Sequence, residues 1–191
     1  MIIGIFGEMG SGKTLLLTIL GKYAYDMGYK IYSNYKVNFE YTPVDIFQLL
    51  DMNLENCVLL LDEAYNYLDA RLSQTQINTL LSHLVFQTRK RNVHLLFTAQ
   101  LLRSVDVRLR NLLNLIIIAQ KVNKGFKYTI FKNAKVFSLY LKEKDAKKFY
   151  NLYNTYEVIE DEIFKMKKEK LKLDIEKLKE KLKKDKEELK V

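Results

Sequence analysis

The chain has 191 residues and a mass of 22.6 kDa, enough for one domain and an appendage. Its hydrophobic fraction of 48% excludes a wholly disordered chain, and its one cysteine excludes an intramolecular disulfide. The longest apolar runs, Cys57–Leu61 and Leu115–Ala119, are far shorter than the roughly 20 residues of a membrane helix. The chain opens on Met1–Phe6 without a basic region, so no signal peptide is expected. We expect a soluble, cytoplasmic protein without a membrane span or a structural metal.

The net charge of +9 is unevenly distributed along the chain. Residues 165–191 hold 12 lysines and 7 acidic residues and supply +5, whereas residues 1–164 supply +4. All six arginines fall within residues 71–110. Arginine suits phosphate and carboxylate partners better than lysine, because its planar fork forms two parallel hydrogen bonds. The arginines are therefore either phosphate ligands or ordinary surface ion pairs, and the modestly basic body is compatible with nucleic acid without requiring it.

Apolar runs rich in β-branched residues alternate with longer amphipathic stretches as far as residue 120, a pattern typical of a parallel α/β sheet. In chain order, this pattern predicts strands at Ile2–Phe6, Lys30–Ser33, Val58–Leu61, Val93–Thr98 and Leu115–Gln120. Helices are predicted at Lys13–Met27, at Val44–Met52 behind Pro43, at Gln74–Lys90 and from Val105 onward. The flanking helices and the mostly parallel sheet define the fold class.

A turn at Asn123–Gly125 marks a change after the parallel part. Two short strands follow it, Phe126–Phe131 and Lys135–Leu139, and they predict an antiparallel hairpin at the sheet edge. A helix at Asp145–Tyr153 is expected to close the domain.

The chain changes character again near residue 157. Residues 1–156 form the predicted α/β domain, and residues 157–191 a long, charged amphipathic helix with a narrow apolar stripe. The stripe consists of Phe164, Leu171, Ile175, Leu178, Leu182 and Leu189. Such a helix can form a short coiled coil, dock on its own domain or contact a partner, and the sequence leaves these alternatives open.

The segment Gly7-Glu8-Met9-Gly10-Ser11-Gly12-Lys13-Thr14 fits the pattern G-x-x-x-x-G-K-[ST] between the first strand and the first helix. Glycines let the backbone curl until its N–H groups point at a β-phosphate, and the helix N-terminus adds partial positive charge. Lys13 is expected to reach the β- and γ-phosphates, and the Thr14 hydroxyl to complete a Mg²⁺ shell. The sequence thus predicts a site for ATP and Mg²⁺ of the P-loop type.

A second apolar run, Cys57–Leu61, ends in the acidic pair Asp62-Glu63. P-loop ATPases hold Mg²⁺ through a water on a carboxylate at the end of such a strand, and we assign this role to Asp62. Glu63 is then placed to polarise an attacking water as a general base. In isolation, such a pair also suits a helix N-terminus, but its position after a P-loop favours catalysis. The glutamate predicts hydrolysis of ATP, not transfer of phosphate to a second substrate.

A third polar residue, Gln100, follows the buried run that begins at Val93. In P-loop ATPases with an extra strand between the two phosphate-binding strands, such a residue contacts the γ-phosphate or the lytic water. An amide donates and accepts hydrogen bonds at once, so it can distinguish ATP from ADP. Other P-loop classes are disfavoured: Asn123–Phe126 lacks the aspartate that reads guanine, and a hairpin after Gln120 stands where AAA+ proteins have a helical lid.

Residues Gln87–Gln100 place arginines shortly before a strand that ends in Gln, and Ser104–Arg108 follow with a Val-Asp helix start. This combination resembles the FtsK/HerA superfamily of DNA-pumping ATPases. Lys30–Asn34 and the Asp-Glu-Ala of residues 62–64 are also similar to the zonula occludens toxin branch, which includes filamentous-phage assembly proteins. The resemblance covers about residues 1–120 and implies a P-loop NTPase fold of the ASCE/RecA-like type.

Residue by residue, the resemblance implies that Gln100 senses the γ-phosphate and that Arg89 is an arginine finger for a neighbouring subunit, with Arg91, Arg108 and Arg110 as further candidates. Members form rings, usually hexamers, and an arginine supplied in trans is worth about 10³–10⁵ in rate. The pore of such a ring binds double-stranded DNA through its phosphates, largely without reading sequence. Small members package viral genomes, and we expect a motor of this kind, without a membrane segment or an N-terminal pilot domain.

Two functions follow from the sequence. The first is a Mg²⁺-dependent ATPase that translocates double-stranded DNA, as in viral genome packaging. The second is a nucleotide-gated virion assembly or export protein of the zonula occludens toxin type, whose C-terminal helix contacts a capsid or assembly partner and which does not pump DNA. A small-molecule kinase is disfavoured by Glu63.

Overall fold

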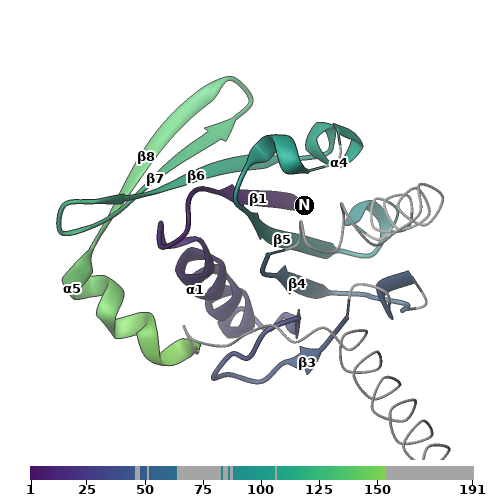
Figure 1. Ribbon diagram of the computed structural model, residues 1–191. Coiled ribbons are helices and arrows are strands. Elements are labelled where there is room, and N and C mark those ends of the chain that lie inside the picture. Colours follow the sequence, from purple (N-terminus) through teal and green to yellow (C-terminus); the bar gives the residue numbers. More distant parts are fainter. Residues whose placement is uncertain are drawn as a thin grey trace, which may run out of the picture. The chain divides into compact units, whose positions relative to one another are not determined.

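Eight strands of the described residues form one sheet in the computed structural model, in the order β3-β2-β4-β5-β1-β6-β7-β8 (Figure 1). The structure describes residues 1–45, 48–50, 52–63, 83, 86, 88–105 and 107–153. Six strands are parallel: β1 (Ile2–Phe6), β2 (Lys30–Ser33), β3 (Thr42–Pro43), β4 (Cys57–Leu61), β5 (Val93–Ala99) and β6 (Leu115–Val122). This arrangement confirms the predicted, mostly parallel α/β sheet.

Strands β1 and β4 are buried at every residue, which explains their uninterrupted apolar sequences. Strand β5 lies between them, with Leu95 opposite both Ile2 and Leu59. Because these three strands are parallel, their carboxyl ends meet at one edge of the sheet, where ligands bind in open α/β folds. We call this edge the carboxyl edge, and the opposite one, where β1 and β5 begin, the amino edge.

Helix α1 (Lys13–Asp26) packs on one face of the sheet against β4 and β5 (Figure 1). It is one residue shorter than predicted. Its buried residues are Leu15, Leu16, Leu17, Thr18 and Gly21. The helix starts at the carboxyl edge, so its N-terminus points toward the ends of β1, β4 and β5.

Strands β7 (Gly125–Lys132) and β8 (Lys135–Lys142) continue the sheet beyond β6 in antiparallel fashion, as predicted. Two-residue turns at positions 123–124 and 133–134 join the three strands. Asn133 and Ala134 both have positive φ, 46° and 63°, as in hairpin turns that match the twist of their strands. β8 is the outermost strand and is exposed along nearly its whole length.

The helix predicted for residues 44–52 is wrong over the described part of that stretch. Pro43 lies in β3 and pairs with Ser33, and the N–H of Val44 donates to the Ser33 carbonyl over 3.0 Å. These contacts keep the chain extended, and helical turns appear only as the 3₁₀ segment η1 (Gln48–Leu50). Proline has no N–H to donate, and an edge strand accommodates it because one side of such a strand has no neighbouring strand to bond.

Short helical segments replace two of the other predicted helices. η2 (Leu102–Ser104) and α4 (Val107–Asn111) stand where a helix from Val105 onward was expected. α5 (Glu143–Ala146) and η3 (Lys147–Leu152) cover the last predicted helix of the domain.

Two further predictions concern residues that lie largely outside the described part of the chain. Residues 83, 86 and 88–90 are helical, within the helix predicted for residues 74–90, and the rest of that helix lies outside the described residues. The predicted C-terminal helix, residues 157–191, and its boundary at residue 156 also lie outside them. Within the described part of the chain, no helix is long and apolar enough to cross a membrane.

Candidate active site

Residues 7–12 form a loop between the carboxyl end of β1 and the start of α1. Two of its glycines are required by close contacts. A Cβ on Gly7 would lie 2.3 Å from the Ala119 carbonyl oxygen, and a Cβ on Gly12 would lie 2.6 Å from the Phe126 ring. Both glycines have positive φ, 152° and 87°, which other residues rarely adopt. The loop therefore rests directly on β6 and β7.

Hydrogen bonds hold this loop in place. The N–H of Gly7 donates to the Gln100 carbonyl over 3.2 Å, and Lys13 Nζ donates to the Glu8 carbonyl over 2.9 Å. Ser11 is buried, and its hydroxyl is one of two buried side-chain polar atoms without a hydrogen-bond partner in the described part of the chain. An unpartnered buried hydroxyl within a glycine-rich loop fits a loop that is completed by a bound anion.

Asp62 lies at the end of β4, in contact with Thr14 at the start of α1. Thr14 Oγ1 is 2.9 Å and 3.1 Å from the two carboxylate oxygens, and Thr98 of β5 donates a further hydrogen bond. Burial raises the pKa of Asp62, while the hydrogen bonds from Thr98 and Thr14 and the charge of Lys13 lower it. The structure places a hydroxyl and a carboxylate at one point, a donor set that fits Mg²⁺, which takes few protein oxygens and fills its shell with phosphate and water.

Two residues without a predicted role hold the acidic pair. Asn34, which follows β2, accepts a hydrogen bond from the Asp62 N–H (2.8 Å) and donates one to the Asp62 carbonyl (2.9 Å). Thr98 Oγ1 accepts one from the Glu63 N–H (2.8 Å). Glu63 has a φ of 50°, an unfavourable conformation that this contact helps to maintain. Polar residues at the carboxyl ends of the strands beside β4 are the signal by which Asn34 and Thr98 could be found.

Electrostatics link Lys13 to the acidic pair. Burial lowers the pKa of Lys13, and the negative charges of Asp62 and Glu63 act against this shift. The structure thus brings Lys13, Thr14, Asp62 and Glu63 together at the carboxyl edge. Gln100 lies beside them at the end of β5, where its carbonyl accepts the Gly7 N–H.

Strand β7 supports the loop through two aromatic residues. Tyr128 is fully buried, and its hydroxyl donates to the Gly12 carbonyl over 3.0 Å. The ring of Phe126 stacks against Tyr128, with centroids 6.5 Å apart, and also contacts Gly12. Burial raises the pKa of Tyr128, so its hydroxyl stays protonated and remains a donor. The antiparallel addition to the sheet is therefore part of the site.

Replacing Tyr128 with phenylalanine is expected to loosen this loop without unfolding the protein. The variant removes one of two donors to the Gly12 carbonyl, which still accepts the Leu16 N–H over 3.1 Å, and loss of this hydrogen bond costs about 1 kcal/mol. We expect a lower melting temperature and an affinity for ATP that is about three- to tenfold weaker, measured by thermal unfolding with and without an ATP analogue. Tyr140→Phe removes an exposed hydroxyl from β8 and is the control. Wild-type affinity in Tyr128→Phe would contradict a role of β7 in holding the loop.

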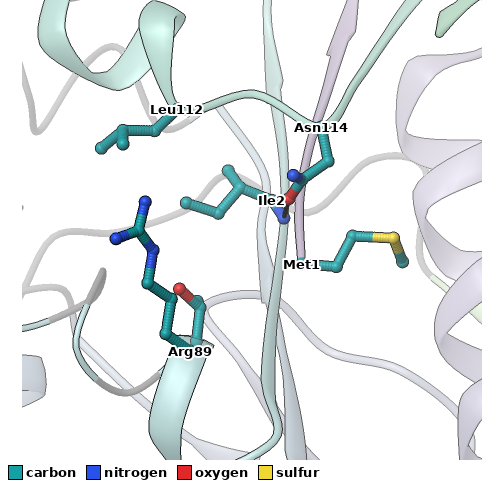
Figure 2. A pocket seen from close by; sticks show the side chains of 6 residues that line it. Met1, Ile2, Arg89, Leu112 and Asn114 are labelled. Carbon is teal, nitrogen blue, oxygen red and sulfur yellow. Dashed lines mark hydrogen bonds between the residues drawn. The ribbon is translucent and has the colours of Figure 1, made fainter. Parts of the chain in front are cut away.

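Arg89 lies at the amino edge of the sheet, in the helical segment ahead of β5. It lines a pocket of about 400 Å³ together with Met1, Ile2, Thr88, Leu112 and Asn114. Figure 2 shows its guanidinium group reaching toward Leu112, while the Asn114 side chain accepts a hydrogen bond from the Ile2 N–H over 2.7 Å. The pocket is therefore at the opposite end of β1 from the glycine loop.

The other candidate arginines also lie toward the amino edge. Arg91 lies two residues before β5, and its carbonyl accepts the Asn56 N–H over 3.0 Å. Arg108 and Arg110 lie in α4, which leads into the pocket residues Leu112 and Asn114 (Figure 1). A strand of five to seven residues spans roughly 17–23 Å. Arg89 and Arg91 are thus too far from the loop of their own chain, and a role in a neighbouring subunit stays a prediction.

Comparison with known proteins identifies relatives of this arrangement. Residues 3–121 match the family described as ATPase family associated with various cellular activities (AAA). The match begins in β1 and ends in β6, so it includes the glycine loop and the acidic pair and stops before the β7–β8 hairpin. The exclusion of AAA proteins is therefore wrong, because it rests on the hairpin, which lies beyond the matched residues.

Two viral proteins are similar in sequence. The ORF2 protein of Spiroplasma virus SpV1-C74 is 28% identical over 169 residues, which cover 84% of this chain and 44% of that protein. The ORF2 protein of Spiroplasma virus SpV1-R8A2 B is 38% identical over 72 residues, 34% of this chain and 21% of that protein. The chain thus spans less than half the length of these relatives.

Two solved structures are similar in fold. The N-terminal domain of zonular occludens toxin from Neisseria meningitidis has a TM-score of 0.58 and 20% identity, over 80% of this chain and 98% of that one. The genome packaging NTPase B204 from Sulfolobus turreted icosahedral virus 2, in complex with ATP-gammaS, has a TM-score of 0.54 and 11% identity, over 72% of this chain and 95% of that one. These similarities confirm the predicted P-loop NTPase fold.

Proposed function

The chain belongs to the AAA family of ATPases. We propose that it hydrolyses ATP to translocate DNA during the packaging of a viral genome. The observation that carries the proposal is the carboxyl edge, where Lys13, Thr14, Asp62 and Glu63 meet beside a glycine loop with an unpartnered buried hydroxyl. Similarity in sequence to viral proteins and in fold to a genome packaging NTPase supports the viral setting. The protein would then act in the cytoplasm of the host cell.

In the proposed reaction, each residue of the carboxyl edge has one task. The loop binds the triphosphate through its backbone N–H groups, and Lys13 contacts the β- and γ-phosphates. Thr14 and Asp62 hold Mg²⁺, whose charge stabilises the phosphates. Glu63 accepts a proton from the attacking water, and the Gln100 amide contacts the γ-phosphate.

The two edges of the sheet suit a head-to-tail assembly. The carboxyl edge carries the triphosphate, and the amino edge carries Arg89, Arg91, Arg108 and Arg110. Contact between the carboxyl edge of one subunit and the amino edge of the next is a heterologous interface, which closes into a ring at a suitable rotation. We infer a homo-oligomeric ring, hexameric as the resemblance implies, in which Arg89 completes the neighbour's site and double-stranded DNA occupies the pore.

ATP hydrolysis measured over a range of protein concentrations, with and without duplex DNA, tests this proposal. We expect activity per subunit to rise with concentration and with DNA, because an arginine in trans contributes about 10³–10⁵ to the rate. Arg89→Ala should lose that increase, whereas Lys90→Ala removes the adjacent exposed cation and should keep it. Strict proportionality to protein without an effect of DNA would contradict a ring motor.

A nucleotide-gated assembly or export protein is the second candidate, favoured by the similarity in fold to the zonular occludens toxin domain. In this case ATP controls contact between residues 157–191 and a capsid or assembly partner, and DNA is not pumped. Removal of residues 165–191 separates the candidates. A DNA motor keeps DNA-stimulated hydrolysis, whereas an assembly protein keeps basal hydrolysis and loses its partner.

A further inference from the structure

The positive charge of the body is concentrated in the antiparallel part of the sheet. Residues 121–148 hold nine lysines and two acidic residues, a net charge of +7. Residues 1–120 hold 11 basic and 10 acidic residues, a net charge of +1. A strongly basic segment of this kind attracts a polyanion. Its lysines lie on β6, β7, β8, α5 and η3 and in the turns between them, whereas the glycine loop is contacted by Phe126 and Tyr128.

Strand β8 is exposed on both faces, and one face of the β7–β8 hairpin combines rings, hydroxyls and lysines. Cross-strand pairing places Lys127 opposite Tyr140, Thr129 opposite Ser138 and Phe131 opposite Val136, so these six side chains share a face, which we call the outer face. Phe131, Val136 and Tyr140 are 41%, 59% and 62% exposed. Large apolar groups with this exposure, grouped on one sheet face, are typical of a binding surface.

The outer face alternates rings with polar groups. Lys127 Nζ lies 5.7 Å from the centre of the Tyr140 ring, and the hydroxyls of Thr129 and Ser138 separate this pair from Phe131. Phe131 pairs with Val136, which lies four residues before Tyr140 on β8, so the two rings are roughly 14 Å apart along the strands. The face thus offers two flat rings, hydroxyls between them and, by register, the two lysines Lys127 and Lys142.

The opposite side of β7 contacts the glycine loop. Successive residues of a strand point to opposite faces, so Lys127 and Thr129 belong to the outer face, whereas Phe126 and Tyr128 point to the other side and contact Gly12. Strand β7 therefore presents one side to the outer face and the other side to the glycine loop.

We propose that the outer face of β7 and β8 binds single-stranded nucleic acid. Lysines contact the phosphates, and the Tyr140 and Phe131 rings stack on unpaired bases, as aromatic residues on open sheets do. Paired bases offer no free faces to these rings, so single strands bind more tightly than duplex. The hydroxyls of Thr129 and Ser138 suit base edges and not the apolar interior of a membrane. The inference goes beyond the proposed function, in which the pore takes double-stranded DNA, because it adds a single-stranded ligand on the outer face, and it rests on that function only where hydrolysis is concerned.

Fluorescence anisotropy of the full chain without nucleotide tests this inference. The probes are oligo-dT and oligo-rU strands of about 20 nucleotides and a duplex of equal length. We expect single strands to bind more tightly than duplex, and Tyr140→Ala to bind them about tenfold more weakly. Tyr140→Phe keeps the ring and should bind like wild type. Tyr23→Ala removes a ring of matched exposure (65%) from α1 and is the second control.

The lysines are tested by salt dependence. Lys127→Gln combined with Lys142→Gln should lower the slope of log affinity against log salt by about 1.4, or about 0.7 for each lost phosphate contact. Lys30→Gln, which changes an exposed lysine of β2, should leave the slope unchanged. Equal affinity for single strands and duplex, no effect of Tyr140→Ala, or binding to phosphatidylglycerol vesicles in place of nucleic acid would overturn the inference. Hydrolysis without strand binding would overturn this inference alone, and strand binding without hydrolysis would overturn only the proposed function.

Discussion

Replacement of Lys13 with alanine is expected to abolish measurable binding of ATP while the chain stays folded. Lys13 is half-buried beside Asp62 and Glu63, and burial lowers its pKa while these acids oppose the shift. A desolvated cation that pairs with phosphate is worth about 2–5 kcal/mol, so the affinity should fall by at least about 30-fold. Calorimetric titration with a non-hydrolysable ATP analogue and Mg²⁺ measures this loss.

The matched control for this change lies on the same helix. Lys22 is nine residues further along α1 and pairs with Asp26, so Lys22→Ala removes a lysine without touching the loop. It should bind the analogue like wild type. Unchanged affinity in Lys13→Ala would refute the assignment of residues 7–14 as the phosphate site, whatever the state of the acidic pair.

The glycine loop and the acidic pair could be predicted because their chemistry is local in sequence. Gly7 to Thr14 are contiguous, and each of the two runs that carry the phosphate and acidic residues is apolar up to its last residue. Buried parallel strands are apolar on both faces, so the first polar residues after them mark the carboxyl edge. Gln100 directly follows β5, although this strand contains the polar residues His94 and Thr98, and the role of Gln100 stays a prediction.

The contacts that support the site depend on tertiary pairing between segments far apart in sequence. Tyr128 and Gly12 are 116 residues apart in sequence, and Asn34 is 28 residues from Asp62. Tyr128 in particular lies in β7, whose aromatic residues are typical of any hairpin strand and do not indicate a contact with the loop. Only the register of β6, β7 and β8 shows that Tyr128 reaches the loop.

The error at residues 44–52 has the opposite cause, a local signal that a long-range contact overrides. Pro43 is well suited to the first turn of a helix, but the same fixed φ fits an edge strand. The Ser33 carbonyl takes the N–H of Val44 and thereby selects the extended alternative. Propensity could not distinguish the two, because the deciding acceptor lies on β2.

Replacement of Glu63 with glutamine is expected to separate binding of ATP from its hydrolysis. Glutamine keeps the size of the side chain and leaves the backbone N–H that donates to Thr98, so the loop and Asp62 should stay in place. It cannot accept the proton of the attacking water, and loss of a general base costs about 10²–10⁴ in rate. We expect near wild-type affinity for the ATP analogue and turnover reduced by that factor, measured by phosphate release.

The outcome of this variant also decides between reaction classes. Glu40→Gln changes an exposed carboxylate between β2 and β3 and should retain full turnover. A residue that only positions Asp62 would lower affinity for Mg²⁺ with ATP and turnover together, whereas a base lowers turnover alone. Full turnover in Glu63→Gln would contradict the assignment of the base. A selective loss of turnover would mean that the strained residue after β4 activates water, as hydrolysis requires and phosphate transfer to a second substrate does not.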